Sequence, residues 1–433
     1  MRKFREYNPG LQRSSAGMDQ LLLMPPDIRE WLPEDHLAYF ISDVAEELDL
    51  GEIYEAYNSS EGGQPAYHPL MMVKILLYGY SVGVASSRKI ERKLREDVAF
   101  RVLSAGSYPD HDTIAEFRKR HLGALSKMFI QVLEMCQKAG LVKLGHIAID
   151  GTKMKGNASK HKAMSYGRMR EKEEELRKKV EEVMKKAEDT DEEEDKKYGK
   201  GKRGDELPEE LRFHKKRLEK IREAKAALEK EAKERKPEGL PEDKVQRNFT
   251  DPESRIMKDS ASKSFIQGYN SQAAVDWKSQ IIVAADAMQV GVDKEQLKPM
   301  LEEVKENTDE YPKEVSADAG YYSEENVKYA EGKGIETYIA PERLEHGEWY
   351  RIGVVRGRKP KGLGVKELMR RKLRTKKGKK TYSKRKETVE PVFGQIKQVR
   401  GFRQFLLRGL EKVRAEWRLI CLTHNLLKLF RYG

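Results

Sequence analysis

Three acidic residues have neighbours that suit metal-dependent chemistry. Asp150 follows the apolar residues of GHIAIDGTK, and Asp318 follows those of EVSADAGYY, so we expect each carboxylate at the end of a buried strand. Glu390 lies in the helical pattern of KRKETVEPVFGQIKQ. Mg²⁺ requires hard oxygen ligands in near-octahedral geometry. Three such carboxylates can therefore hold two Mg²⁺ ions about 3.5–4 Å apart, which activate the attacking oxygen and stabilise the leaving oxygen at a phosphodiester.

Other carboxylates compete for this role. Glu387 lies one turn before Glu390 on the same helix face, but apolar residues surround Glu390, as expected for a carboxylate at the edge of a core. Asp276 and Asp286 lie beside predicted strands, where we interpret them as strand-end or turn residues. By itself Asp150, in Asp-Gly, is typical of a turn. Together with the other two carboxylates it favours catalysis.

Several basic and histidine side chains allow more than one interpretation. Lys153 and Lys155 follow Asp150 and either face a scissile phosphate or are simply exposed. His111, with an Asp on each side, is typical of a helix cap, and His424 with Asn425 lies in an apolar helical pattern that indicates a structural role. No Gly-rich phosphate loop of the Walker type occurs, so ATP is not implied.

Composition favours a polyanionic partner. The 433 residues include 85 Lys and Arg against 72 Asp and Glu, a net charge of +13. Basic surface gains free energy by releasing counterions from nucleic acid, although a highly charged protein without such a partner has a similar balance. Two cysteines support neither a disulfide framework nor a cysteine metal site. No apolar run approaches the length of about 18 residues needed to span a membrane, and the polar N-terminus lacks a signal core, so we expect a cytoplasmic protein.

The first third of the chain has a helical pattern, and we assign residues 1–140 to a helical DNA-binding domain. Strong helical signals begin at His68-Pro69 and continue to about Gly140. We expect the basic runs SSRK at 86–89 and RKR at 118–120 to be exposed on helices joined by short turns. This arrangement permits a helix-turn-helix-like domain; an ordinary helical bundle with a solvated basic face is the alternative.

The rest of the chain, residues 141–433, has the pattern of a mixed α/β sheet. A strand pattern before 160 is followed by a charged segment at about 160–247, in which Met169, Leu176 and Val183 recur every seven residues. We interpret this segment as an inserted antiparallel helical hairpin, which contacts DNA, contacts another protomer or is only solvated. From residue 264, two strand patterns precede alternating helices and strands, which favours a mixed sheet over a doubly wound one.

A very basic segment lies between residues 343 and 386. It includes RGRKPKGLGVKELMRRKLRTKKGKKTYSKRK and has few apolar residues. We interpret it as a flexible strip that follows a phosphate backbone; a disordered linker is the alternative.

Taken together, the motifs resemble the DDE transposases of bacterial insertion sequences. The matching pieces are YHPLMMVKILLYGY, SYPDHDTIAEFRKRH, AIDGTK, SADAGYYS and VEPVFGQIKQVRGFRQFLLRG, and the resemblance covers nearly the whole chain. It implies an RNase H-like catalytic domain with a mixed sheet and flanking helices, preceded by a helical domain. It also implies that Asp150, Asp318 and Glu390 are the catalytic, metal-binding triad.

The resemblance further implies residues that contact DNA near the cleaved end. Lys397 lies seven residues after Glu390, two turns further along one helix face, and Tyr382 matches a family tyrosine before the glutamate. The family's arginine four residues before the glutamate is replaced here by Lys386, with Arg385 one place earlier, so the basic contact is either of these two.

As a member of this family, the protein is expected to cleave DNA at transposon ends and transfer the strand to target DNA. The implied cofactor is Mg²⁺, with Mn²⁺ as a substitute, and the implied assembly is a homo-oligomer on DNA. Two alternatives stay open: an RNase H-like nuclease that lacks joining activity, and a catalytically silent DNA-binding protein derived from a transposase.

Overall fold

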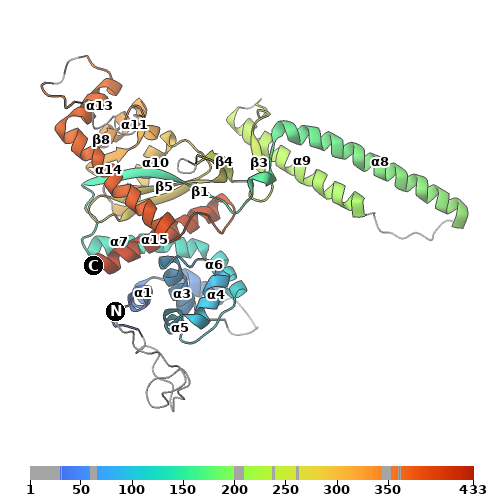
Figure 1. The fold of residues 1–433 in the computed structure, drawn as a ribbon, viewed down its shortest axis with the longest axis horizontal. Helices are drawn as coiled ribbons and strands as arrows, with labels where there is room; N and C mark the ends of the chain where they lie inside the picture. The colour runs from blue at the N-terminus through green and yellow to red at the C-terminus, as the bar shows by residue number, and fades with distance from the viewer. Residues whose placement is uncertain are drawn as a thin grey trace, which may run out of the picture. The chain divides into compact units, whose positions relative to one another are not determined.

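The computed structural model describes residues 30, 32–58, 66–198, 209–236, 239–259, 263–343, 353–358, 360 and 362–433. By packing, the chain divides into two compact units, Met1–His121 and Leu122–Gly433 (Figure 1). The functional domains inferred from the sequence, 1–140 and 141–433, stay a prediction.

The first unit is helical. Its helices form around the apolar helix α3, which begins with Pro69 in its first turn and buries ten of its thirteen residues. Asp110 caps α6 by accepting the N–H of Thr113 at 2.7 Å, which confirms the helix-cap interpretation of the sequence around His111. The helices are α1 (Leu37–Glu47), α2 (Gly51–Asn58), α3 (Pro69–Ser81), α4 (Ser87–Glu96), α5 (Val98–Leu103) and α6 (His111–Arg120).

The basic runs of this unit are not equally exposed. Arg118 is 6% exposed, and its guanidinium donates to the hydroxyl of Tyr80 at 3.2 Å and to the carbonyl of Ala85 at 2.8 Å. The prediction that 118–120 forms an exposed basic run is therefore wrong for Arg118, which ties α6 to the end of α3. In the other run Ser87 is buried, whereas Arg88 and Lys89 are exposed.

A mixed sheet lies at the centre of the second unit, as the sequence predicts (Figure 1). β1 pairs antiparallel with β5 and parallel with β7, β7 pairs parallel with β8, and β5 pairs antiparallel with both β4 and β6. The order β6-β5-β1-β7-β8, three antiparallel strands followed by two parallel ones, confirms the RNase H-like fold. The strands are β1 (His146–Lys155), β4 (Arg255–Lys258), β5 (Phe265–Asp276), β6 (Ile282–Met288), β7 (Glu314–Ala317) and β8 (Glu336–Ile339).

Helices complete the core of this unit. α15 packs against α7 and β6, and α14 contacts β1, β5, β7 and β8. On α15, Asn425 accepts the N–H of Ile282 and donates to its carbonyl, so its amide satisfies the backbone of β6. His424 is buried and hydrogen-bonded to Gln395 and Gln280, which confirms a structural role. The helices are α7 (Leu122–Lys138), α10 (Leu297–Thr308), α11 (Glu324–Gly332), α13 (Val365–Arg374), α14 (Lys376–Gly394) and α15 (Leu410–Tyr432).

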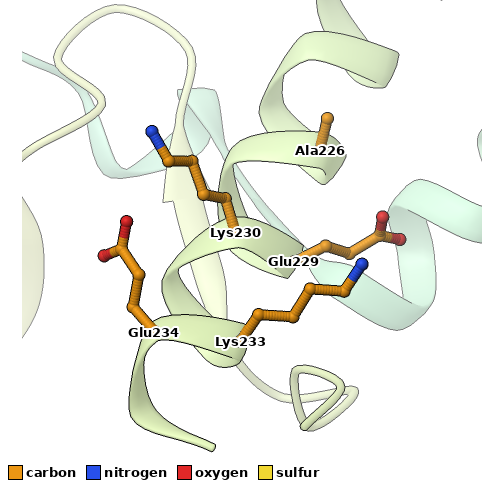
Figure 2. A pocket seen from close by; sticks show the side chains of 5 residues that line it. All are labelled: Ala226, Glu229, Lys230, Lys233 and Glu234. Carbon is orange, nitrogen blue, oxygen red and sulfur yellow. The ribbon is translucent and has the colours of Figure 1, made fainter. Parts of the chain in front are cut away.

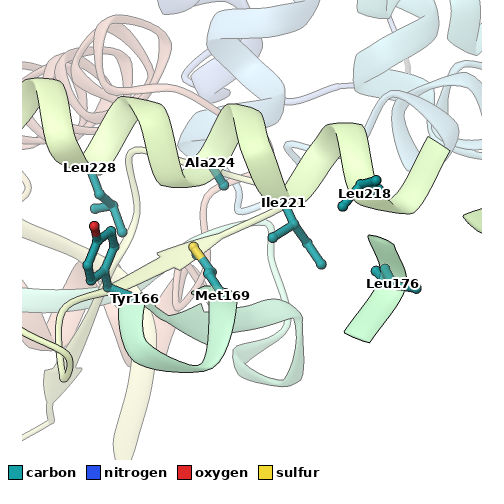
Figure 3. Close-up of a cluster of buried hydrophobic side chains, with 7 residues drawn as sticks. All are labelled: Tyr166, Met169, Leu176, Leu218, Ile221, Ala224 and Leu228. Atoms are coloured by element: carbon teal, nitrogen blue, oxygen red, sulfur yellow. The ribbon is translucent and has the colours of Figure 1, made fainter. Parts of the chain in front are cut away.

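The charged insertion forms a helical hairpin. α8 (Tyr166–Tyr198) packs along α9 (Glu209–Arg235), and the two-stranded sheet of β2 (Ala163–Ser165) and β3 (Gln246–Asn248) joins their base to the unit. We call α8 and α9 the arm. Its apolar seam is separate from the main core (Figure 3) and consists of Tyr166, Met169, Leu176, Leu218, Ile221, Ala224 and Leu228.

The basic segment is helical from residue 365, so the prediction of a flexible strip is wrong for 365–386. Val365, Met369 and Leu373 recur every four residues and give α13 an apolar face that packs near Val327 and Tyr338. Residues 344–352, 359 and 361 lie outside the described part of the chain.

Cations of this segment also have local partners. Arg370 pairs with Glu342 at 2.9 Å, and Lys372 and Lys377 pair with Glu336 at 3.3 and 2.7 Å. These pairs satisfy charges that we expected to face a phosphate backbone. Among the described residues, no helix combines the length and the apolar character needed to cross a membrane.

Candidate active site

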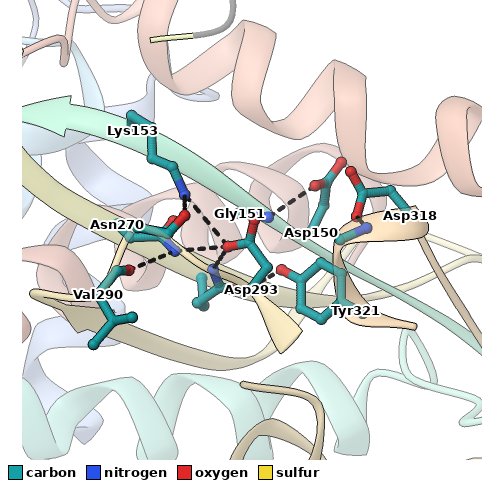
Figure 4. A network of polar contacts seen from close by, with 11 residues as sticks. Asp150, Gly151, Lys153, Asn270, Val290, Asp293, Asp318 and Tyr321 are labelled. Atoms are coloured by element: carbon teal, nitrogen blue, oxygen red, sulfur yellow. Dashed lines mark hydrogen bonds and ion pairs between the residues drawn. The ribbon is translucent and has the colours of Figure 1, made fainter. Parts of the chain in front are cut away.

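The register between β1 and β7 brings Asp150 and Asp318 side by side. The two strands are parallel, and Ile149 lies opposite Ala317, so the next residue on each strand is an aspartate. The carboxylate of Asp318 accepts the N–H of Gly320 at 2.8 Å and caps a short 3₁₀ turn, Ala319–Tyr321. Figure 4 shows the two carboxylates next to each other at this edge of the sheet. The structure thus joins two of the three predicted catalytic residues.

Asp150 lies where its charged form is disfavoured. The pKa of its carboxyl is raised to about 7; burial is the largest cause, and the charges of Asp318 and Asp293 act in the same direction. The guanidinium of Arg385 and the N–H of Gly151, each donating at 2.8 Å, act in the opposite direction. Near neutral pH the group is therefore close to the point at which it gains or loses a proton.

α14 carries Glu390, the third predicted catalytic residue, together with Arg385 and Tyr382. Arg385 is 11% exposed in its side chain, donates to Oδ2 of Asp150, and lies 5.9 Å from the ring centroid of Tyr382. Burial lowers the pKa of Arg385, but neighbouring acidic groups, Asp150 first, outweigh burial and the net shift is upward. Glu390 is exposed, and its charge contributes to this upward shift of Arg385. Glu390 therefore lies on the site's helix, within electrostatic reach of Arg385.

The predicted DNA contacts fall in different places. Tyr382 is partly buried, and burial raises the pKa of its hydroxyl, as do the charges of Asp318 and Asp150. It therefore lies beside the paired aspartates. Of the two basic candidates, Arg385 meets Asp150, whereas Lys386 is exposed.

Lys397 lies beyond a change in helix geometry. α14 ends at Gly394, and a π-helical turn, η5 (Gln395–Val399), follows. The regular helix that the sequence reasoning assumed between Glu390 and Lys397 is therefore interrupted by a wider turn. The amino group of Lys397 donates to the hydroxyl of Thr152 at 2.6 Å and to the carbonyl of Lys153 at 2.9 Å. Lys397 therefore fastens this turn to β1 just beyond Asp150.

Sequence reasoning missed Asp293. It lies between β6 and α10, at the start of a 3₁₀ turn (Lys294–Gln296), where an aspartate is indistinguishable from an ordinary cap. Its Oδ1 accepts from Asn270 at 2.6 Å, from Gln272 at 2.8 Å and from Lys153 at 3.4 Å (Figure 4). The signal available in the sequence was a pair of amide side chains, Asn270 and Gln272, at alternate positions of the strand β5. Lys153 therefore faces a carboxylate, whereas Lys155 is exposed.

The carboxylates of Asp150, Asp318 and Asp293 are oxygen ligands of the kind that a hard divalent cation prefers. Asp150 is largely buried beside the carboxylates of Asp318 and Asp293, and a cation between them would offset the repulsion that contributes to its raised pKa. In the chain itself, the guanidinium of Arg385 supplies positive charge to Asp150. Within the described ranges, no three His, Cys, Asp or Glu side chains stand close enough together to form a ready-made metal cage.

Other acidic residues have structural partners. Asp276 accepts backbone N–H groups from Lys143, Leu144 and Lys278, which confirms its interpretation as a turn residue. The interpretation of Asp286 as a strand-end or turn residue is wrong: it lies within β6, opposite Gln272 of β5, and its carboxylate pairs with Arg414 of α15 at 2.9 Å.

A hollow of about 440 Å³ on α9 shares none of the residues of the site (Figure 2). It is lined by Ala226, Glu229, Lys230, Lys233 and Glu234.

Two family models match the chain. Residues 26–120 match a transposase domain (DUF772), and residues 239–426 match a transposase DDE domain. The matches lie in the helical first unit and in the sheet-containing second unit, and together they cover more than half of the sequence. Neither a curated protein nor a solved structure matches the chain.

The RNase H-like sheet and its paired aspartates define an enzyme of the nuclease and transposase class. The chain belongs to the DDE transposases of insertion sequences. DDE transposase domains use divalent metal ions, and transposases bind DNA.

Proposed function

We propose that this protein catalyses Mg²⁺-dependent cleavage at transposon ends and strand transfer into target DNA, with Asp150, Asp318 and Glu390 as its catalytic residues. The observation that carries the proposal is the β1–β7 register, which places the two aspartates side by side. α14, which bears Glu390, contacts both of these strands. The three carboxylates thus come from the elements that meet at one edge of the sheet.

Each residue has a role that follows from its position. Asp150 and Asp318 would hold the metal ions, and Glu390 would complete one site from the exposed face of α14. Bound Mg²⁺ supplies Lewis-acid stabilisation of the attacking and leaving oxygens of an in-line displacement. Arg385 orients Asp150 through Oδ2 and leaves Oδ1 to the N–H of Gly151. Exposure of Glu390 leaves room for DNA on that side.

Cleavage of a supercoiled plasmid that carries the native element ends tests this function. We expect nicking at the ends with Mg²⁺, no nicking with EDTA, and loss of nicking in Asp318→Asn. Asp286→Asn is the matched control because Asp286 pairs with Arg414 rather than facing the site. Joined products identify a transposase, and cleavage without joining identifies a nuclease. If wild type and Asp318→Asn bind DNA equally and neither cuts, the silent DNA-binding alternative is correct.

We further propose that α4 is a DNA-contacting helix of the first unit. α3, a turn containing Gly83 at φ 79°, and α4 follow one another as in a helix-turn-helix. The turn packs closely on α3 because Gly79 has no side chain: a Cβ there would lie 2.7 Å from the carbonyl oxygen of Val84. Ile90 and Leu94 bury one face of α4, which leaves its basic face exposed. The exposed cations of that face are Arg88, Lys89, Arg92 and Arg95.

Salt dependence of binding to transposon-end DNA tests this assignment. Each phosphate contact contributes about 0.9 to the slope of log K against log salt concentration. We expect Arg88→Ala with Lys89→Ala to lower that slope by about 2 and to weaken binding. Lys119→Ala is the control, because Lys119 is exposed but pairs with Glu116 at 3.3 Å. An unchanged slope in the double variant refutes a phosphate-contacting α4.

The remaining features of the proposal follow from the family. Tyr382, Arg385, Lys386 and Lys397 are proposed to lie near the DNA end, and the active assembly is proposed to be a homo-oligomer on paired ends. We place the protein in the bacterial cytoplasm, with the nucleoid DNA that it acts on.

A further inference from the structure

The carboxylate of Asp293 is held in a fixed direction beside the paired aspartates. Three donors converge on its Oδ1: the amides of Asn270 and Gln272 from β5, and the amino group of Lys153 from β1. Its side chain is 21% exposed. In the described part of the chain, none of its hydrogen bonds or ion pairs involves Oδ2. One oxygen is therefore anchored, and the direction of the other is determined by that anchor.

Gly151 makes space for this carboxylate, and Gly320 lies beside it. A Cβ on Gly151 would lie 2.9 Å from Oδ1 of Asp293 and would clash with the amide of Gln272. A Cβ on Gly320 would lie 3.5 Å from Oδ2 of Asp293 and 3.0 Å from Oδ1 of Asp318. Oδ2 of Asp293 and Oδ1 of Asp318 thus both lie within 3.5 Å of the position that a Gly320 Cβ would occupy. Each of these glycines follows an aspartate of the proposed triad by one or two residues.

The anchor of Asp293 is also linked to the turn that positions Asp318. Tyr321, fully buried in that turn, donates through its hydroxyl to the amide oxygen of Gln272, whose nitrogen donates to Asp293 (Figure 4). If Asp293 only capped its turn, its carboxylate would accept hydrogen bonds from backbone N–H groups of that turn. Instead its Oδ1 is tied to the two strands beneath the site.

We propose that Asp293 is a fourth acidic residue of the metal site and that its Oδ2 binds the same divalent cation as Asp318, directly or through one water. The inference rests on the proposed function, since it assigns a ligand to that site. A cation of this kind takes carboxylate oxygens and water together. Asp293 adds a negative charge that the triad alone does not supply, and Gly151 is required because a Cβ there would displace Asp293 and its amide donor Gln272.

Mn²⁺ binding to the full-length chain without DNA tests the inference apart from activity. Free Mn²⁺ is measured by electron paramagnetic resonance during a titration at pH 8. Wild type is compared with Asp293→Asn, Asp318→Asn and the control Asp286→Asn, and circular dichroism establishes that each variant is folded. Asp293→Asn keeps an amide oxygen for the three donors but loses the second carboxylate oxygen. Asp293→Ser, which also keeps an acceptor, takes its place if the first variant does not fold.

We expect Asp293→Asn to weaken Mn²⁺ binding at least tenfold and Asp286→Asn to leave it unchanged. Binding that is weakened in Asp318→Asn but equal to wild type in the Asp293 variants overturns the inference and leaves the proposed function standing. Wild-type binding that Asp318→Asn does not alter overturns both. A matching loss in Asp286→Asn also overturns the inference, because the effect would then reflect general acidity.

Discussion

The guanidinium of Arg385 donates to Oδ2 of Asp150 over 2.8 Å and so joins α14 to β1 across 235 residues of sequence. Both side chains are largely buried, 11% and 20% exposed. Because Glu390 lies five residues beyond Arg385 on the same helix, this pair also sets where Glu390 stands relative to the aspartates. The contact therefore both positions α14 on β1 and lowers the pKa of Asp150.

Replacement of Arg385 by Met should destabilise the protein by about 2 kcal/mol, since the change removes a partly buried, charge-assisted hydrogen bond. It should also raise the pKa of Asp150, because Arg385 is the main group that lowers it. Urea denaturation measures the first effect. Lys386→Met is the control: Lys386 is exposed, so its free energy of unfolding should change by no more than about 0.5 kcal/mol. Equal losses in the two variants would contradict the structural role of the pair.

Asp150 should make stability depend on pH in the absence of metal. Its pKa of about 7 in the folded chain lies above the ordinary value of 3.8. Between these values the folded state retains a proton that the unfolded state has lost, so the free energy of unfolding falls as pH rises from about 4 to 7. The loss, on the order of 4 kcal/mol for a pKa difference of roughly three units, should be absent in Asp150→Asn.

Thermal unfolding from pH 4 to 8 in EDTA, for wild type and Asp150→Asn, measures this dependence. Mg²⁺ should restore stability to wild type at pH 8 and have little effect on Asp150→Asn, because ligand binding to the folded state alone stabilises it. Parallel pH curves for the two proteins in EDTA would show that Asp150 does not titrate as proposed.

Sequence reasoning succeeded where local pattern decides structure. The apolar runs before Asp150 and Asp318 predicted the strands, and the seven-residue repeat beginning at Met169 predicted the arm. The expectation of a strand end is correct for Asp318 but wrong for Asp150, because β1 continues to Lys155 through its pairing with β5. Sequence reasoning failed where a tertiary contact decides: Arg118 looks like part of an exposed basic run, yet it is buried because Tyr80 and Ala85 provide acceptors. It also could not find Asp293, whose partners on β1 and β5 lie at least 21 residues away in sequence.

A single methyl group at Gly151 should be costly. Its Cβ would clash with the amide of Gln272 and lie 2.9 Å from Oδ1 of both Asn270 and Asp293, so a Gly151→Ala variant must shift packed polar groups. Overpacking of this kind costs about 1–3 kcal/mol. Gly145→Ala is the control, because no atom lies within 4 Å of a Cβ there. Urea midpoints compare the two, and a Gly151→Ala variant as stable as Gly145→Ala would contradict the described packing.

The arm should unfold separately from the sheet. Its apolar seam forms its own cluster, so truncating a buried residue there removes contacts that the main core does not share. Leu228 is 2% exposed, and Leu228→Ala should lower the local stability of α8 and α9 by about 2–3 kcal/mol. Phe213→Ala is the control, since Phe213 is 61% exposed. Native-state hydrogen exchange should show faster exchange in both arm helices of Leu228→Ala and unchanged protection in β1 and β5; equal acceleration in the strands would mean that the arm and the catalytic core unfold as one unit.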